Sequence, residues 1–136
     1  MDDDGRRTQG MAVRRQVLGD PHVERATAGA TAFTADFQDF ITRYAWGDIW
    51  SRPGLDRRTR SVITIALLAG LGHHAELALH IGAGLRNGLT REEISEVLLQ
   101  TGIYAGVPAA NTAFAIAAEA LAAEPPASEP PVSRGT

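Results

Sequence analysis

The sequence predicts an all-α fold, a single-domain bundle of about six helices, on three observations. Apolar residues recur at three- and four-residue spacing, alanine is frequent along the chain, and the alternating pattern of a β-strand is never sustained. The 136 residues fit one domain that can bury a core without disulfides or metal ions. We expect a flexible N-terminus over residues 1–10, a helical domain over 11–123 and a disordered proline-rich tail over 124–136.

Local backbone chemistry sets the expected helix boundaries. Helical segments are expected at 11–18, 23–45, 56–71, 74–87, 90–104 and 108–123. The first ends at Gly-Asp-Pro, residues 19–21, and the second is followed by the turn signature Arg-Pro-Gly at 52–54. Asp56 is expected to cap the third helix, and Thr90 and Glu93 form a capping box for the fifth.

The helices are expected to assemble around segment 56–71. This segment is apolar on nearly all sides from Val62 onward, so it should be the central, buried helix. Small residues are frequent in 74–87 and 108–123, which allows helices to approach closely within or between subunits. Because so thin a helical layer would leave apolar faces in water, we favour a homo-oligomer.

Composition excludes several classes of function. The formal net charge is −3, which argues against binding to nucleic acid or to anionic membranes. All 13 basic residues are Arg and Cys is absent, so lysine Schiff bases, thiol nucleophiles, disulfides and thiolate zinc sites are ruled out. The apolar stretch at 62–72 is shorter than the ~20 residues of a transmembrane helix. The acidic start does not resemble a signal peptide, so we expect a cytoplasmic location.

Helix 74–87 carries the first candidate for chemistry. His73, Glu76 and His80 lie on one helical face at spacings i, i+3 and i+7. Glu76 precedes His80 by one turn, close enough to orient and charge the imidazole, and such a pair suits general acid or base catalysis. An ordinary surface or interface pair is the alternative. A metal site is disfavoured because the spacing is not HExxH, so no metal is expected.

A group of arginines and two tryptophans form the second candidate. Arg57, Arg58 and Arg60 occupy the first turn of a helix, where the helix dipole disfavours positive charge. This pattern predicts an anion nearby, either a carboxylate ligand or acidic residues of a partner subunit, with a solvated charged face as the alternative. Trp46 and Trp50 are expected to be core or interface anchors, or the wall of a pocket.

Tyr104 and Asn111 are further candidates for ligand contact. They bracket the Gly-Val-Pro break at 106–108, where backbone groups are released from helical hydrogen bonds. Either side chain could donate a hydrogen bond to a ligand. Hydrogen bonding to the nearby backbone is the alternative for both.

Five segments of the chain resemble the carboxymuconolactone decarboxylase family. They are 37–55 (FQDFITRYAWGDIWSRPGL), 57–61 (RRTRS), 87–94 (NGLTREEI), 97–100 (VLLQ) and 106–111 (GVPAAN), and the similarity extends from about residue 6 to 123. Related peroxidases of the alkyl hydroperoxide reductase D type carry a CxxCxxxH motif, which falls here on His73, Glu76 and His80. Both thiols are therefore missing, and peroxidase chemistry by that route is excluded.

The resemblance implies a fold, an activity and roles for the candidate residues. It implies an all-α, alkyl hydroperoxidase D-like homo-oligomer, without a cofactor, that decarboxylates γ-carboxymuconolactone to β-ketoadipate enol lactone in protocatechuate breakdown. Taken with the chemistry, it assigns catalysis to His80 and Glu76, and substrate binding to Arg57, Arg58, Arg60, Trp46, Trp50, Tyr104 and Asn111. The alternatives are a relative acting on another lactone or β-keto acid, and a non-catalytic helical oligomer that binds a small anion.

Overall fold

A computed structural model describes residues 1–124, and within them all regular structure is helical. The helices are α1 (Asp3–Leu18), α2 (Asp20–Ala28), α3 (Ala35–Ile41), the π-helix η1 (Thr42–Ile49), α4 (Arg57–Leu71), α5 (His74–Arg86), α6 (Arg91–Ala105) and α7 (Val107–Ala123). The all-α prediction is confirmed, with seven α-helices in the described part against about six expected. The expected disordered tail lies outside the described residues from position 125 onward.

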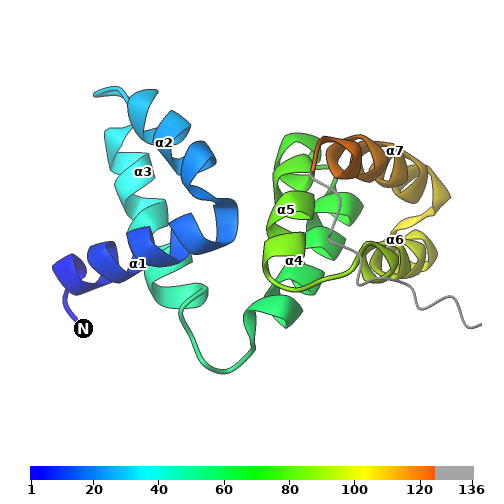
Figure 1. The fold of residues 1–136 in the computed structure, drawn as a ribbon, viewed down its shortest axis with the longest axis horizontal. Coiled ribbons are helices and arrows are strands. Elements are labelled where there is room, and N and C mark those ends of the chain that lie inside the picture. Colours follow the sequence, from blue (N-terminus) through cyan, green and yellow to red (C-terminus); the bar gives the residue numbers. More distant parts are fainter. Residues whose placement is uncertain (125–136) are drawn as a thin grey trace, which may run out of the picture.

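The helices form two groups, as Figure 1 shows: α1 to η1 on one side and α4 to α7 on the other, joined by a loop after η1. In the first group α1 packs across η1, and in the second α4, α5, α6 and α7 pack around a common core. Helix α5 also contacts α1, because Leu79 and Ala83 join the core that Val17 and Trp46 form. The two groups therefore meet along one face of α5.

The N-terminal segment differs from the expectation of a flexible stretch over 1–10, because α1 begins at Asp3. The Asp2 carboxylate accepts a hydrogen bond from the Gly5 amide at 2.7 Å, which caps the helix. The Arg7 guanidinium then donates to the Asp39 carboxylate of α3 at 2.6 Å. The acidic start is thus held by a local cap and by an ion pair between residues that are distant in sequence.

The second expected helix, 23–45, is divided in the structure. Helix α2 ends at Ala28, and a turn follows in which the Thr31 amide donates to the Thr34 side-chain oxygen at 2.9 Å. Helix α3 begins at Ala35 and continues directly into η1. Most of the apolar stripe is helical, as predicted. Glycine and threonine residues between α2 and α3 form a turn that interrupts the helix.

Two glycines allow α1 and η1 to cross at backbone distance. A Cβ on Gly10 would overlap the carbonyl oxygen of Thr42, and a Cβ on Gly47 would overlap that of Arg6. The π-helical spacing is seen directly where the Trp50 amide donates to the Ala45 carbonyl at 2.9 Å, five residues back. The crossing places Trp46 of η1, and Trp50 directly after η1, against α5.

The second group has a continuous apolar core. Ile65 of α4, Leu77 and Ile81 of α5, and Leu98 of α6 are completely buried. The expected Asp56 cap and the Thr90–Glu93 capping box are both present. No helix over residues 1–124 combines the length and apolar character that crossing a membrane requires.

Helix α4 differs from the central, buried helix that the sequence predicts. Only one of its faces is buried, the one that carries Ser61, Ile65 and Ala69. Leu67 and Leu71 on another face are 55% and 68% exposed. In this single chain the helix therefore presents an apolar face that no other described helix covers.

Candidate active site

His80 lies on α5 at the boundary between the two groups of helices. Its imidazole is stacked on the indole of Trp46, with ring centroids 6.4 Å apart and planes 9° from parallel. It is also stacked on Trp50, at 6.2 Å and 18°, and the two indoles stack on each other at 5.2 Å. The structure thus brings three of the candidate residues, from η1 and α5, into one aromatic cluster.

The environment of His80 favours the neutral imidazole. The pKa of His80 is lowered from its usual 6.5 to about 4, chiefly by burial and also by the nearby His22, while Glu76 acts in the opposite direction. The Nδ1 atom of His80 is buried and has no hydrogen-bond partner among the described residues. A buried polar atom without a partner is costly in a folded protein, and a ligand group that bonded to it would remove that cost.

Glu76 does not charge His80 as the sequence spacing predicts. Glu76 is exposed at the start of α5, and no hydrogen bond between its carboxylate and the imidazole occurs in the described part of the chain. Its effect on the pKa of His80 is smaller than that of burial, so the imidazole stays neutral at neutral pH. Glu76 does lie one helical turn before His80, but the Glu76 side chain is exposed whereas the His80 side chain is half-buried.

A cavity of about 290 Å³ adjoins the aromatic cluster through Trp50. Its charged and polar walls come from α1, from the loop after η1 and from the start of α4: Gln9, Ser51, Arg52, Asp56 and Arg57. Ser51 donates to the Trp46 carbonyl at 2.6 Å, which fixes the turn that carries Trp50. Arg57 is therefore the member of the arginine group that shares a cavity with a residue of the cluster.

The other two arginines have partners within the protein. Arg58 pairs with the Glu93 carboxylate of α6, and both side chains are partly exposed. Arg60 donates to the Arg52 carbonyl at 3.2 Å, and its Nε is buried without a partner in the described structure. Arg58 thus joins α4 to α6, and Arg60 holds the loop that walls the cavity.

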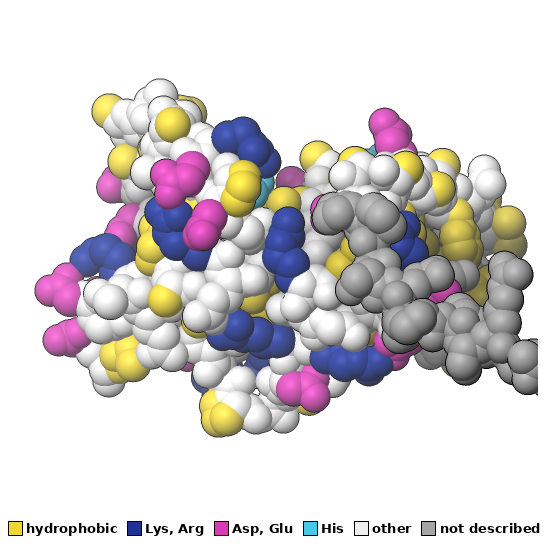
Figure 2. Space-filling model, viewed as in Figure 1, with side chains coloured by type: hydrophobic (Ala, Val, Ile, Leu, Met, Phe, Trp, Pro, Cys, Tyr) yellow, Lys and Arg dark blue, Asp and Glu magenta, His cyan; other side chains and the backbone are white. Residues whose placement is uncertain are grey.

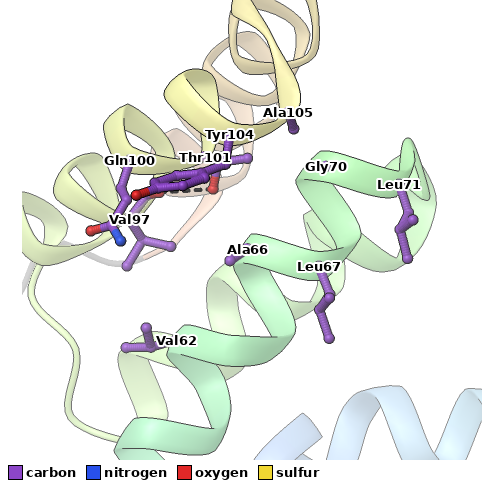
Figure 3. A pocket seen from close by; sticks show the side chains of 10 residues that line it. All are labelled: Val62, Ala66, Leu67, Gly70, Leu71, Val97, Gln100, Thr101, Tyr104 and Ala105. Carbon is purple, nitrogen blue, oxygen red and sulfur yellow. Dashed lines mark hydrogen bonds between the residues drawn. The ribbon is translucent and has the colours of Figure 1, made fainter.

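Tyr104 and Asn111 lie elsewhere. Tyr104 lines a groove of about 430 Å³ between α4 and α6, where it faces Val62 and Ala66 across the opening (Figure 3). Asn111 is exposed on α7. Neither lines the cavity that Trp50 and Arg57 share.

Three residues near the cluster are not among the site residues predicted from the sequence. Arg52 and Gln9 line the Trp50 cavity, and His22 lies close enough to His80 to affect its pKa. Arg52 belongs to the same arginine-rich segment as Arg57, and this local enrichment in arginine is a sequence signal that points to it. Gln9 lies in the stretch that was expected to be flexible, and nothing in the local sequence pointed to it.

No group of three His, Asp or Glu side chains in residues 1–124 is arranged to hold a metal ion. His73 and Glu76 are both exposed, and His80 is half-buried against the tryptophans. The expectation that the site needs no metal remains a prediction.

A comparison with known protein families shows to which family the chain belongs. The chain matches the model of the carboxymuconolactone decarboxylase family over residues 35–119, which include η1, the cavity loop and helices α4 to α6. The chain belongs to this family. The family match spans Trp46, Trp50, Arg57 and His80, so the cluster and the adjoining arginine lie within the part of the chain that the family model matches.

Proteins similar to this chain include two decarboxylases with different named substrates. The chain is 49% identical over 119 residues to a 4-carboxymuconolactone decarboxylase of Acinetobacter baylyi, covering 88% of this chain and 89% of the relative. It is 43% identical over 108 residues to a nitrosuccinic acid decarboxylase, npaB, of Metarhizium robertsii, covering 79% and 76%. A 4-carboxymuconolactone decarboxylase of Pseudomonas putida is 50% identical over 48 residues, 35% of this chain.

Proposed function

We propose that the protein is a carboxy-lyase that converts 4-carboxymuconolactone (γ-carboxymuconolactone) to β-ketoadipate enol lactone in protocatechuate catabolism, without a cofactor. The relative in Acinetobacter baylyi, which aligns with most of this chain, supports the substrate. The observation that carries the proposal is the shared position of Trp50, which stacks on His80 and also lines the cavity that contains Arg57. Trp50 thus borders both a group that can donate a hydrogen bond and a cavity whose arginine can bind a carboxylate.

The proposed substrate supplies its own electron sink. It is an unsaturated five-membered lactone that carries a carboxylate and an acetate arm on one ring carbon. When the bond from that carbon to the carboxylate breaks, carbon dioxide leaves and the electron pair moves through the ring double bond onto the lactone carbonyl. The resulting dienolate takes a proton on the carbon next to the carbonyl and becomes the enol lactone. The protein has to bind the carboxylates, stabilise the oxyanion and provide the proton.

Arg57 is assigned to the carboxylate that stays on the product. Its guanidinium can bind a carboxylate with two parallel hydrogen bonds, which fixes the orientation of the ring. Arg52 lines the same cavity but also pairs with Asp48 at 3.4 Å, so it is the secondary cation of this site. Leaving the departing carboxylate against indole rings, away from the guanidinium, weakens its hydration and favours loss of carbon dioxide.

His80 is assigned to the oxyanion. Since burial keeps the imidazole neutral, one ring nitrogen carries a hydrogen and can donate to the lactone oxygen as negative charge develops there. The two negative charges of a bound substrate would raise the pKa of His80, which favours uptake of the proton that the dienolate then receives. Glu76 has the lesser role of raising the same pKa from the helix surface.

A second substrate class has a specific observation in its favour. The relative in Metarhizium robertsii, 43% identical, is named for decarboxylation of nitrosuccinic acid, which is not a lactone. The same arginine and histidine would serve any carboxylate whose loss of carbon dioxide leaves negative charge on an adjacent acceptor group. A carboxylate with a different acceptor group, such as nitrosuccinic acid, a β-keto acid or another lactone, is therefore the alternative substrate.

The protein is also expected to assemble into a homo-oligomer, a trimer or hexamer, and to be located in the cytoplasm. Apolar side chains on α4 and α6 support assembly, since Leu67, Leu71, Ile103 and Tyr104 are all more than half exposed in one chain. Sedimentation of the wild type and of a Leu67→Glu variant tests it, with Thr112→Glu on the exposed side of α7 as the control. Dissociation by the first change alone is expected, and a monomeric wild type would contradict assembly.

The test of the activity is direct. Purified protein is mixed with freshly generated 4-carboxymuconolactone, and enol-lactone formation is followed optically with and without a chelator. Rapid conversion that the chelator does not affect is expected. Loss of all activity to the chelator would contradict the metal-free mechanism. No conversion by a folded protein that does decarboxylate nitrosuccinic acid or a β-keto acid would transfer the proposal to the alternative substrate, and inactivity towards all three would favour an anion-binding oligomer.

A further inference from the structure

A smaller cavity lies where α2, α5 and the end of α7 meet. Its volume is about 160 Å³. Four of the side chains that line it can carry charge: His22 and Arg25 of α2, Arg86 of α5, and Glu124. Leu79 lines it as well, next in sequence to His80. It is separate from the cavity of Trp50 and Arg57, because the two have no lining residue in common.

The cavity carries an excess of unpaired positive charge. Within residues 1–124, neither Arg25 nor Arg86 forms an ion pair. Arg86 packs against Gly19 and donates to the Val17 carbonyl at 3.5 Å, a long contact that leaves most of its donors free. Glu124 is the one acidic residue of the wall, so the groups around the cavity do not neutralise one another.

Glu124 lies over α5 instead of on a guanidinium. The Oε1 atom of Glu124 would be 2.6 Å from a Cβ placed on Gly82, so the carboxylate rests on backbone that only glycine leaves open. The Arg86 Nη1 atom would be 3.7 Å from the same point, yet the two side chains form no ion pair. The carboxylate therefore borders the cationic wall without occupying it.

A third arginine adds to the positive charge near His22. Arg14 of α1 is 5% exposed, and its guanidinium donates to Thr42 and Gln38 while its Nε has no partner in the described chain. Arg14, Arg25 and Arg86 all lower the pKa of His22, after burial, which is the largest cause. Figure 2 shows arginine side chains gathered along the junction of the two groups of helices on this face.

We propose that this cavity binds a small oxyanion, a carboxylate or a phosphate, between Arg25 and Arg86 with His22 as an adjoining donor. Its volume suits a ligand of this size, since a water molecule takes about 30 Å³ and acetate or phosphate has only a few heavy atoms. Guanidinium groups with free donors are the preferred partners of both anions. The site does not depend on the proposed decarboxylation, and no step of that reaction uses it.

The occupied site is linked to His80. An anion next to His22 opposes the three arginines and stabilises the protonated imidazole, so it raises the pKa of His22. The ligand's negative charge also acts on His80, which lies near His22. A bound anion therefore changes the protonation of the candidate catalytic group without touching its substrate.

The test is a titration of the full-length protein followed by NMR of the four histidine rings, with His22 assigned from a His22→Gln variant. Sodium acetate and sodium phosphate are added separately, with ionic strength kept constant by sodium chloride. A saturable shift of the His22 signals and a rise in the pKa of His22 are expected. Whichever anion saturates at lower concentration identifies the ligand class.

Three variants make the result specific. Arg25→Gln should weaken binding about tenfold or more, because it removes a charge-assisted contact. Glu124→Gln should strengthen it by removing the one repelling carboxylate. Arg15→Gln is the control, since Arg15 pairs with Asp20 and Glu24 outside the cavity and should leave binding unchanged.

Two outcomes would overturn the proposal. A shift that does not saturate, or that is equal in the wild type and Arg25→Gln, would mean general screening by salt. A saturable shift confined to other histidines would place the anion elsewhere. Because binding is read without turnover, failure of the anion site leaves the decarboxylation assay unaffected, and failure of that assay leaves the anion site unaffected.

Discussion

The imidazole of His80 lies within 9° of parallel to the indole of Trp46. The two rings come from α5 and η1, which belong to different groups of helices. Trp50 stacks on the same imidazole and lines the cavity that contains Arg57. The candidate oxyanion donor is thus supplied by one half of the molecule, and the walls that orient it are supplied by the other.

Replacement of His80 by Ala should lower kcat by about 100-fold or more, because it removes the group assigned to the oxyanion and the proton. Steady-state kinetics with the decarboxylation substrate measure the change. Glu76→Gln is the matched control on the same helix, and it should lose much less, since Glu76 is exposed and its influence on His80 is small. Equal losses in the two variants, or a normal rate in the first, would refute the assignment.

Arg57→Gln should lower kcat/KM by about 10- to 100-fold, which corresponds to one charge-assisted contact to a carboxylate. Arg58→Gln, one residue away, should change it little, because Arg58 faces Glu93 and that partly exposed pair contributes at most about 1 kcal/mol. Kinetics of both variants at one pH give the comparison. A larger loss in Arg58→Gln would show that the wrong arginine has been assigned.

The free energy of unfolding should fall as the pH is lowered from about 6.5 to about 4. His80 has a pKa of about 4 in the folded protein but about 6.5 when unfolded, so in this window the unfolded chain binds the extra proton. At about 1.4 kcal/mol per pKa unit, the loss is on the order of 3 kcal/mol. His22, whose pKa is also lowered, contributes in the same direction.

Urea unfolding of the wild type and of His80→Ala across this range measures the effect. The variant should begin less stable at neutral pH, because the ring contacts are lost, and should show a shallower dependence on pH. Identical slopes for the two proteins would mean that His80 titrates normally in the fold.

Gly10→Ala should destabilise the protein by about 1–3 kcal/mol, although alanine ordinarily favours a helix. The added Cβ would overlap the Thr42 carbonyl oxygen, so α1 and η1 would have to separate. Gly54→Ala is the control, since no atom lies within 4 Å of a Cβ at that position. Thermal melting of both variants checks the prediction, and an unchanged Tm for Gly10→Ala would show that the crossing can relax without cost.

The caps and the second group of helices could be predicted from sequence because their signals are local. Asp56 and the Thr90–Glu93 capping box act within one helical turn, and the structure has both. The π-helical form of η1 could not be predicted in this way, and neither could the contact that holds the start of α1 against α3. They depend on the Arg7–Asp39 ion pair and on the glycine crossing, which join residues more than 30 positions apart.

In the candidate site, too, some features could be predicted from the sequence, and others depend on contacts between distant segments. The residue types were visible in the sequence, and the structure groups His80, Trp46 and Trp50 as one cluster. Spacing along one helix misled at Glu76, because helical proximity says nothing about burial, and burial dominates the pKa of His80. Arginine composition also could not separate Arg57 from Arg58, since their partners lie on other segments.

Because the site lies between two groups of helices, a bound ligand should help to hold the two groups together. A molecule that contacts both η1 and α5 is bound only while the two groups remain docked, so it acts as a reversible crosslink between them. Amide exchange at their contact should therefore slow as substrate or product accumulates. In the cell, resistance of the chain to proteolytic degradation would then rise and fall with the supply of its own substrate.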